Sequence, residues 1–370
     1  MTSLRIGVNA LYLIPGGVGG TEVYLRSLLD GLARVDRNNE YVVFVNRETG
    51  PDLVPAAANF RAVETGLRAR NRPARLLWEQ LRLPGAARRE RLDVLFNPGF
   101  TAPARCRCPS VTVFHDLQHK RHPEYFRWFD LPFWNWFLWQ SARTSKALIA
   151  VSEATAADLE RYYPGTAPRT SVVHHGVDEE LRRVARRRDP ELFLLCVSTL
   201  HPHKNLERLI RAFAGFHRKH PGFRLVLAGM KGFHTAAVER AVEEGRLGGA
   251  VELTGWISRE AVRDLYRRAW AFVLPTTFEG FGMPVLEALA AGVPCACSDI
   301  PPLREVAGDA ALRFPPEDEK AIEEALERLV TDDALRSRLS AAGRSRAARF
   351  SWERCARETL AVLRRTAAHV

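Results

Sequence analysis

The feature that most constrains this sequence is an alternation, over nearly its whole length, of short continuous apolar runs with segments of helical periodicity. Between two such runs, apolar residues at Leu25, Leu28, Leu29 and Leu32 have the spacing of a core-facing helix. The strand-like runs are residues 4–10, 41–46, 93–97, 111–116, 147–152 and 170–175, then 192–199, 223–229, 251–255, 271–276 and 294–298. Apolar strands that alternate with helices indicate parallel sheets covered on both faces. Two such series predict an α/β protein with two Rossmann-like, doubly wound domains.

The length supports the same division, because 370 residues exceed what a single core usually holds. The polar, arginine-rich stretch 177–191 is the expected boundary. We therefore expect an N-terminal domain over 1–180 and a C-terminal domain over 190–348. The last helical segment, 349–370, is a candidate for a return to the first domain.

Composition narrows the class of protein. With 46% hydrophobic and 26% charged residues the chain is predicted to be globular, and its net charge of +11 favours an anionic partner. That partner could be nucleic acid, a membrane surface or a phosphate-bearing small molecule; the alternative is an arginine-rich composition with no such meaning. No signal-peptide pattern opens the chain, and no apolar run reaches the length of a membrane span. We expect a cytoplasmic protein.

The six cysteines favour the same compartment. Cys106 and Cys108 form a CxC that is too closely spaced for an ordinary zinc pair, and Cys196, Cys295 and Cys297 lie in strand-like runs. Buried free thiols in a reducing environment are the favoured interpretation.

The stretch TTFEGFGMPVLEA, residues 276–288, follows a predicted strand. Ligands of parallel α/β sheets bind at the carboxyl ends of strands, so this loop should face a ligand. Gly280 and Gly282 permit a close approach of the backbone, and Pro284 has the fixed φ favoured at the start of a helix. The amides of Phe281 through Val285 should therefore form an anion site suited to a diphosphate.

Two carboxylates flank that predicted site. Glu279 on the loop and Glu287 one turn into the helix are acceptors that suit vicinal diols, such as those of a sugar and of a ribose. The alternative is an ordinary strand–loop–helix with a glutamate favoured by the helix dipole. The segment by itself leaves both interpretations open.

Further motifs support the ligand. Residues 279–287 match a Glu–x7–Glu pattern; 198–206 read STLHPHKNL, 253–258 LTGWIS, 15–22 PGGVGGTE, 113–116 VFHD and 305–314 EVAGDAALRF. Together they resemble the GT-B retaining glycosyltransferases of family 4, over roughly residues 5 to 350. The resemblance implies two Rossmann-like domains that face each other across a cleft.

The resemblance also implies roles. Glu279, Lys204 and His115 are the implied catalytic residues: Glu279 would hold the sugar, Lys204 would neutralise the diphosphate, and His115 would lie beside the transferred sugar. For His115 the alternative is a satisfied histidine at a strand end. The implied donor-binding residues are Gly19, Gly20, Thr199, His203, Lys204, Trp256, Ile257, Phe281, Gly282, Met283, Pro284, Val285 and Glu287.

One departure from the family concerns the turn before Lys204. The family commonly has an arginine there, and this chain has Thr199, His201 and His203. Only a protonated histidine resembles arginine in charge, so the difference bears on donor affinity or its dependence on pH.

The implied reaction moves a hexose from a nucleotide-diphosphate sugar to a hydroxyl of a saccharide or lipid-linked saccharide, in synthesis of cell-envelope polysaccharide. Front-face attack retains the anomeric configuration, with a donor phosphate oxygen taking the proton. The segments 78–80 (WEQ) and 202–205 (PHKN) resemble mannosyl- and rhamnosyltransferases, which favours a GDP-mannose-like donor. No DxD pattern stands out near the donor loop, so we expect no metal and no cofactor.

Three rival classes are less well supported. A sugar-nucleotide epimerase shares the architecture, and an acceptor requirement would separate it from a transferase. An NAD-dependent enzyme would need G-x-G-x-x-G directly after the first strand, and PGGVGG comes later than that. A nucleic-acid-binding protein fits the charge, but no zinc-finger, helix-turn-helix or RNP-like signature accompanies it.

Two segments bear on the acceptor. Residues 125–143 place four tryptophans in one predicted helix beside basic residues; a core helix is favoured, and peripheral contact with an anionic membrane is the alternative. Residues 68–92 are strongly basic and could guide an anionic acceptor, although a solvated face is the favoured interpretation.

Overall fold

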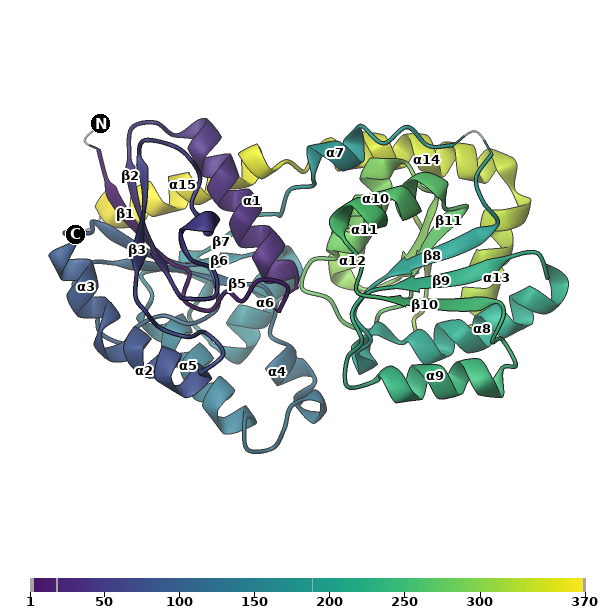
Figure 1. Ribbon diagram of the computed structural model, residues 1–370, viewed down its shortest axis with the longest axis horizontal. Coiled ribbons are helices and arrows are strands. Elements are labelled where there is room, and N and C mark those ends of the chain that lie inside the picture. Colours follow the sequence, from purple (N-terminus) through teal and green to yellow (C-terminus); the bar gives the residue numbers. More distant parts are fainter. Residues whose placement is uncertain (1–2, 18, 188, 369–370) are drawn as a thin grey trace. The chain divides into compact units, whose positions relative to one another are not determined.

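The computed structural model describes residues 3–17, 19–187 and 189–368, and it divides into two compact units (Figure 1). Unit 1 comprises Met1–Gly176 together with Ser351–Val370, and unit 2 comprises Val177–Phe350. Each unit is built on its own parallel sheet. The prediction of two doubly wound α/β domains is confirmed.

Unit 1 holds a seven-stranded sheet in the order β3-β2-β1-β4-β5-β6-β7. Its strands are β1 (Arg5–Asn9), β2 (Glu40–Val45), β3 (Phe60–Glu64), β4 (Val94–Asn97), β5 (Ser110–Phe114), β6 (Ala147–Ala150) and β7 (Thr170–Val172). Its helices are α1 (Gly20–Val35), α2 (Arg72–Leu81), α3 (Leu83–Arg89), α4 (Gln118–Arg121), α5 (Leu131–Thr144), α6 (Glu153–Tyr162) and α15 (Trp352–Ala368), with short 3-10 turns at η1 (Pro51–Leu53), η2 (Pro123–Tyr125) and η3 (Ala167–Arg169).

The final helix of the described chain, α15, packs against α1 within unit 1. Figure 1 shows α15 in yellow beside the purple α1. The helices approach closely at Gly31 of α1, where an added Cβ would lie 2.8 Å from the carbonyl oxygen of Trp352. A second glycine, Gly176, leaves room for the backbone of Trp352. The small residues therefore let the C-terminal helix complete the first core.

Unit 2 holds a six-stranded sheet in the order β10-β9-β8-β11-β12-β13. Its strands are β8 (Phe193–Val197), β9 (Arg224–Ala228), β10 (Val251–Gly255), β11 (Ala271–Leu274), β12 (Cys295–Ser298) and β13 (Leu312–Phe314). Its helices are α7 (Glu179–Arg182), α8 (Leu206–Lys219), α9 (Thr235–Glu244), α10 (Arg259–Arg268), α11 (Met283–Ala291), α12 (Pro301–Ala307), α13 (Glu319–Thr331) and α14 (Asp333–Ala347), with a 3-10 turn at η4 (Pro202–Lys204).

Strand order gives each sheet one point where the winding direction reverses. In unit 1 that point lies between β1 and β4, and in unit 2 it lies between β8 and β11. Ligands of open α/β sheets bind beside the carboxyl ends of the strands at such a switch point. The loops after β8 and β11 therefore define where to look for a site in unit 2.

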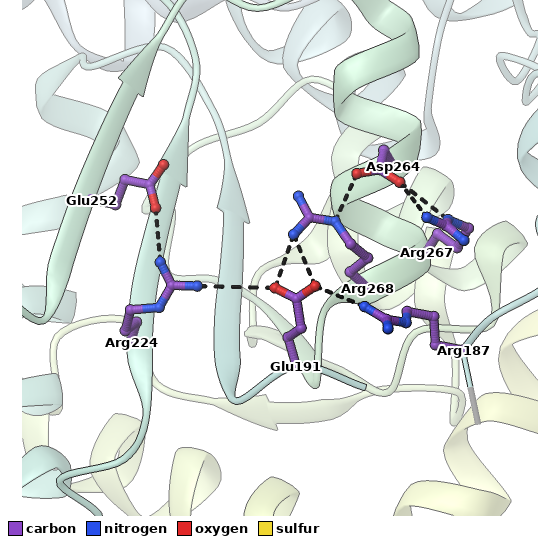
Figure 2. Close-up of polar contacts among 7 residues, drawn as sticks. All are labelled: Arg187, Glu191, Arg224, Glu252, Asp264, Arg267 and Arg268. Atoms are coloured by element: carbon purple, nitrogen blue, oxygen red, sulfur yellow. Dashed lines mark hydrogen bonds and ion pairs between the residues drawn. The ribbon is translucent and has the colours of Figure 1, made fainter. Parts of the chain in front are cut away.

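The opposite edge of the second sheet carries a network of ion pairs (Figure 2). Glu191, which precedes β8, contacts Arg187 at 2.9 Å, Arg268 at 2.9 Å and Arg224 at 4.0 Å. Arg224 also reaches Glu252 at 3.2 Å. Asp264 joins the network through Arg268 and Arg267 near the end of α10. These pairs connect the starts of neighbouring strands to a covering helix.

The free cysteines differ from the prediction at one place. Cys196, Cys295, Cys297 and Cys355 are buried, as expected of structural thiols. Cys106 and Cys108 are only partly buried, so the prediction of buried thiols is wrong for this pair. They lie in the loop before β5 and pack against the edge of a core cluster that includes Leu83 and Leu92.

Candidate active site

The two loops at the switch point of unit 2 are tied to each other. The carbonyl oxygen of His203 accepts hydrogen bonds from the amide of Thr277 at 2.7 Å and the hydroxyl of Thr276 at 2.9 Å. Asn205, at a left-handed φ of 57°, donates from Nδ2 to the carbonyl of Pro275 at 2.9 Å. These hydrogen bonds therefore fix the turn after β8 against the loop after β11. The sequence analysis missed Asn205 and the two threonines; the Thr-Thr pair at a strand end was the available signal.

The contact between these two loops brings two predicted catalytic residues together. Nζ of Lys204 lies 2.6 Å from Oε1 of Glu279, and the two side chains are only 12% and 11% exposed. A charge-assisted hydrogen bond of this length, shielded from water, is stronger than one between exposed partners. The sequence assigned the pair to neighbouring parts of one ligand, and the structure places them in direct contact.

The segment between the two glutamates forms the predicted loop and helix start. Gly282 caps α11 at φ 101°, a conformation that favours glycine, and an added Cβ would lie 2.3 Å from Leu303. Helix α11 begins at Met283, so Pro284 is its second residue. The amide of Val285 donates to the carbonyl of Gly282 at 3.1 Å. The first turn of the helix therefore uses this amide, and a contact of Val285 with a ligand stays a prediction.

The remaining predicted donors of this segment lie at the beginning of the helix. Phe281 is buried, whereas Met283 is partly exposed. The first amides of an α-helix have no partner within the helix, and the helix dipole favours an anion there. The amides of Gly282 and Met283 thus retain the geometry of an anion site, and their role stays a prediction.

The second glutamate, Glu287, has a neutral partner. The hydroxyl of Tyr266 on α10 donates to Oε2 of Glu287 at 3.2 Å. Burial raises the pKa of the Glu287 carboxyl above its ordinary value, although Arg259 and the Tyr266 hydrogen bond oppose this. The sequence analysis missed Tyr266, because nothing in the spacing of 21 residues links it to Glu287.

The other predicted donor-binding residues of unit 2 lie at the same edge of the sheet. Thr199 follows β8 and is partly buried, as is His203 in η4. Trp256, 67% exposed, and Ile257 follow β10, which is separated from β8 by β9. The amide of Gly229 after β9 donates to the carbonyl of Gly255 at 3.2 Å and joins these loops. A base-framing role for Trp256 and Ile257 stays a prediction, as does a phosphate contact by the His203 ring.

In unit 1, Gly19 and Gly20 begin α1 and are exposed. Gly19 adopts φ 58°, which other residues rarely do, and an added Cβ at either glycine would meet no atom within 4 Å. Val18, in the middle of the predicted glycine loop, lies outside the described residues. The two glycines present a helix N-terminus without side chains, which is the local geometry that an anion needs.

His115 follows β5 and is buried. Its Nε2 lies 2.8 Å from the carbonyl oxygen of Pro98, so this nitrogen carries the proton. The rings of Tyr24, Phe100 and His175 surround it at centroid distances of 4.8, 5.1 and 5.6 Å. Burial lowers the pKa of His115 to about 4, so the ring is neutral at physiological pH. The contact with Pro98 satisfies one nitrogen and leaves Nδ1 as an acceptor, and a position beside the transferred sugar stays a prediction.

A buried polar cluster at the switch point of the first sheet escaped the sequence analysis. Asn9 and Asn97 end the adjacent strands β1 and β4, and their side chains meet at 3.2 Å. Oε2 of Glu79 on α2 accepts from Asn9 and from Thr101, each at 3.0 Å. Burial raises the pKa of Glu79. An asparagine at the end of each strand-like run was the signal that could have revealed this cluster.

The tryptophan-rich segment is neither wholly core nor wholly surface. In α5, Phe137 and Leu138 are buried, whereas Trp136 and Trp139 are half exposed. Trp128, before the helix, is 84% exposed. Arg143 lies over the ring of Trp139 at 5.5 Å.

In the parts of the chain that the structure describes, no helix is long and apolar enough to cross a bilayer. Among the same residues, no three His, Cys, Asp or Glu side chains group as a metal site.

Solved structures with a similar fold cover almost the whole chain. The chain matches sucrose-phosphate synthase from Thermosynechococcus elongatus with a TM-score of 0.81 at 20% identity, over 99% of this chain and 100% of that one. It matches Anabaena HepE, solved with UDP and glucose, with a TM-score of 0.75 at 16% identity, over 98% and 99%. The fold is therefore that of the GT-B glycosyltransferases.

Sequence relatives define the family within that fold class. The family model described as glycosyl transferases group 1 matches residues 177–346, and the model described as glycosyltransferase family 4 matches 18–181. The O-antigen chain mannosyltransferase B of Escherichia coli is 30% identical over 286 residues, which cover 74% of this chain and 75% of that protein. The chain belongs to the glycosyl transferases group 1 family and is a glycosyltransferase.

Proposed function

We propose that this glycosyltransferase is a retaining hexosyltransferase. Unit 2 binds a nucleotide-diphosphate sugar, and unit 1 supplies residues for an acceptor hydroxyl on a saccharide or lipid-linked saccharide. The observation that carries the proposal is the shielded contact of Lys204 with Glu279 at the switch point of the second sheet. A cation and a carboxylate held there match the two chemical parts of such a donor, an anionic diphosphate and a hydroxyl-bearing sugar.

The charges suggest how the donor would be held. A diphosphate oxygen competes with Glu279 for Lys204, and the amides of Gly282 and Met283 lie at the adjacent helix start. Once Lys204 contacts phosphate, the oxygens of Glu279 are available to accept hydrogen bonds from sugar hydroxyls. Glu287, further along α11, would accept from the ribose.

In the reaction, the bond between the anomeric carbon and the diphosphate oxygen breaks, and negative charge develops on the leaving diphosphate. Lys204 and the two amides stabilise that charge. The acceptor hydroxyl attacks the same face of the sugar, and a donor phosphate oxygen takes its proton. The anomeric configuration is thereby retained, and no protein carboxylate needs to form a covalent bond.

The relatives favour mannose as the sugar. The E. coli relative is an O-antigen chain mannosyltransferase, which supports a GDP-mannose-like donor and a place in cell-envelope polysaccharide synthesis. HepE was solved with UDP and glucose, which makes a UDP-hexose the donor to compare. A sugar-nucleotide epimerase remains the alternative reaction, because it uses the same donor and needs no acceptor.

A donor panel tests the proposal. Purified protein is incubated with GDP-mannose, UDP-glucose and TDP-sugars, with and without saccharide acceptors and EDTA, and the anomeric proton coupling of the product is measured by NMR. We expect donor consumption only with an acceptor, an α-linked product from an α-linked donor, and no effect of EDTA. Donor conversion without an acceptor supports the epimerase, and an inverted product contradicts the retaining reaction.

We also propose that unit 1 lies peripherally against an anionic membrane on the cytoplasmic face. Trp128, Trp136 and Trp139 are exposed, and Arg127 and Arg143 lie over neighbouring aromatic rings. Aromatic side chains with basic neighbours suit the interface of an anionic bilayer. We expect co-sedimentation with phosphatidylglycerol vesicles that weakens in a W128A/W136A variant. Equal binding by the variant, or none by wild type, contradicts this contact.

A further inference from the structure

The CxC pair in unit 1 has a geometry that glycosyl transfer does not use. Cys106 and Cys108 lie in the loop that leads into β5, and their sulfur atoms are 3.3 Å apart. This separation is a non-bonded contact in which one thiol donates to the other sulfur. His115 follows the other end of the same strand, so the pair and the predicted acceptor site lie at opposite edges of the first sheet.

Cys106 and Cys108 are also the cysteines that solvent can reach. Both residues are partly exposed, whereas the other four cysteines are buried. Burial raises the pKa of Cys196 to about 12 and that of Cys355 to about 12, which keeps these thiols protonated and unreactive. The four buried thiols therefore serve as unreactive controls for Cys106 and Cys108 in the same protein.

The two accessible sulfurs are not equivalent. The hydrogen bond from Cys108, helped by the amides of Cys108 and Arg107, lowers the pKa of Cys106 to about 7 against the effect of burial. The same hydrogen bond and burial raise the pKa of Cys108. Cys106 is thus the more acidic thiol of the pair and the one expected to attack first. A thiolate with a pKa near ambient pH is the most effective nucleophile towards a disulfide.

The surface around the pair is strongly basic. A hollow of about 330 Å³ on one side includes Arg88, Arg91 and Arg107. A hollow of about 530 Å³ on the other side is lined by Arg105, Arg107, Arg143, Lys146 and Arg169. The single acidic residue among the described residues that line the two hollows is Asp93. These hollows can accept a small molecule that bears carboxylates.

We propose that Cys106 and Cys108 form a thiol-modification site, at which an anionic low-molecular-weight disulfide binds in the basic hollows and converts the pair into an intramolecular disulfide. The site is independent of the proposed function, since it lies at the edge of the first sheet opposite to His115 and uses none of the predicted donor-binding residues.

The exchange proceeds in two balanced steps. The Cys106 thiolate attacks one sulfur of the small disulfide, and the second half leaves as a thiolate. Cys108, after loss of its proton to water, attacks the Cys106 sulfur of the mixed disulfide and releases the first half as a thiolate. The protein is oxidised by two electrons, and one disulfide molecule is reduced to two thiols. An excess of small thiol reverses both steps.

Oxidised glutathione, which carries carboxylates, is the probe, and cystamine, which is cationic, is its matched control. Wild type and the variants C106S and C108S are incubated with each at low and high salt, then analysed by intact mass and peptide mapping after alkylation. Circular dichroism verifies that the variants are folded.

We expect wild type to lose two hydrogens without a lasting adduct, and C108S to retain glutathione on Cys106. C106S should react at least about threefold more slowly, because a more basic thiol is less ionised. Glutathione should react faster than cystamine at low salt, and the difference should shrink at high salt. The proposal is overturned if wild type stays reduced or keeps an adduct, if C108S gains none, or if cystamine reacts as fast as glutathione.

Discussion

The two ends of the strands in the second sheet differ in their ion pairs: those at the amino ends are exposed and connected in a network, and the pair at the carboxyl ends is shielded and single. At the amino edge, Glu191 contacts three arginines whose side chains are 28–48% exposed, and Asp264 and Glu252 extend the network (Figure 2). At the carboxyl edge, Lys204 and Glu279 have side chains that are nearly covered, and the contact between them is the one ion pair that the structure gives to either residue in the described chain. Glu287 at the same edge meets the hydroxyl of Tyr266.

This difference separates structural charge from charge that is available to a ligand. Exposed and redundant pairs lose little when one partner is removed, since water and the remaining partners compensate. A shielded single pair is sensitive to any ion that competes for one member. The contrast indicates that substitutions at the carboxyl edge should affect catalysis, and those at the amino edge should affect stability slightly.

The largest expected effect comes from removing the lysine. Lys204→Met should lower kcat about 10²–10³-fold, because it removes a group that stabilises the charge on the leaving diphosphate. Steady-state transfer rates with saturating donor measure this. The double variant K204M/E279Q, which leaves no unpaired carboxylate, is the control for stability. A folded K204M enzyme with the wild-type rate would falsify the proposed role of the pair.

An intermediate effect is expected at Glu287, whose pKa is raised by burial. Donor affinity should fall as the pH drops towards this raised pKa, because the protonated carboxyl accepts ribose hydrogen bonds poorly. Glu287→Gln should bind the donor about tenfold more weakly near pH 8 and lose this dependence, since one hydrogen bond to a charged group is worth about 1.5–3 kcal/mol. Calorimetric titration of the nucleotide between pH 5.5 and 8 measures both.

Stability should change in the opposite direction at the same residue. The folded protein holds the Glu287 proton more tightly than the unfolded chain, so this residue's contribution to the free energy of unfolding falls as pH rises from the ordinary carboxyl pKa through the raised one. E287Q should therefore be at least as stable as wild type at pH 8. An affinity that is independent of pH in wild type, or a variant strongly destabilised at pH 8, contradicts this account.

The smallest effect is expected at the amino edge. Glu191→Gln should lower the free energy of unfolding by about 0.5–1 kcal/mol, with no change in transfer rate, because its pairs are partly exposed. Urea denaturation at low and high salt measures the loss, which should shrink as salt screens the network. A reduced transfer rate in E191Q would show that the two edges are coupled.

Sequence reasoning was most reliable where local chemistry decides structure. Glycine and proline signals predicted the loop and helix of 276–291, and apolar runs predicted eleven of the thirteen strands of the two sheets. The two missed strands are local exceptions: β3 alternates a buried Phe60 with an exposed Arg61 at the sheet edge, and β13 has only three residues. Neither forms a continuous apolar run.

The sequence could not predict contacts that depend on how distant segments pack. The partners Tyr266 and Glu287 meet because α10 and α11 lie together, and Glu79 reaches Asn9 across 70 residues. Motif spacing also could not show that Lys204 contacts Glu279. The sequence assigned Lys204 to the diphosphate and Glu279 to the sugar, and gave no reason to pair the two side chains with each other. The sequence also could not predict that Trp136 and Trp139 are half exposed, because an aromatic helix can face either the core or the surface.

The return of α15 to unit 1 has a consequence for biosynthesis. Unit 2 is continuous in sequence, so all of its strands are synthesised before residue 351. The surface of α1 that receives Trp352 and Ala356 stays uncovered until the final helix emerges. The first core therefore receives its last helix only after the whole of unit 2 has been synthesised, although N-terminal domains generally fold first during translation.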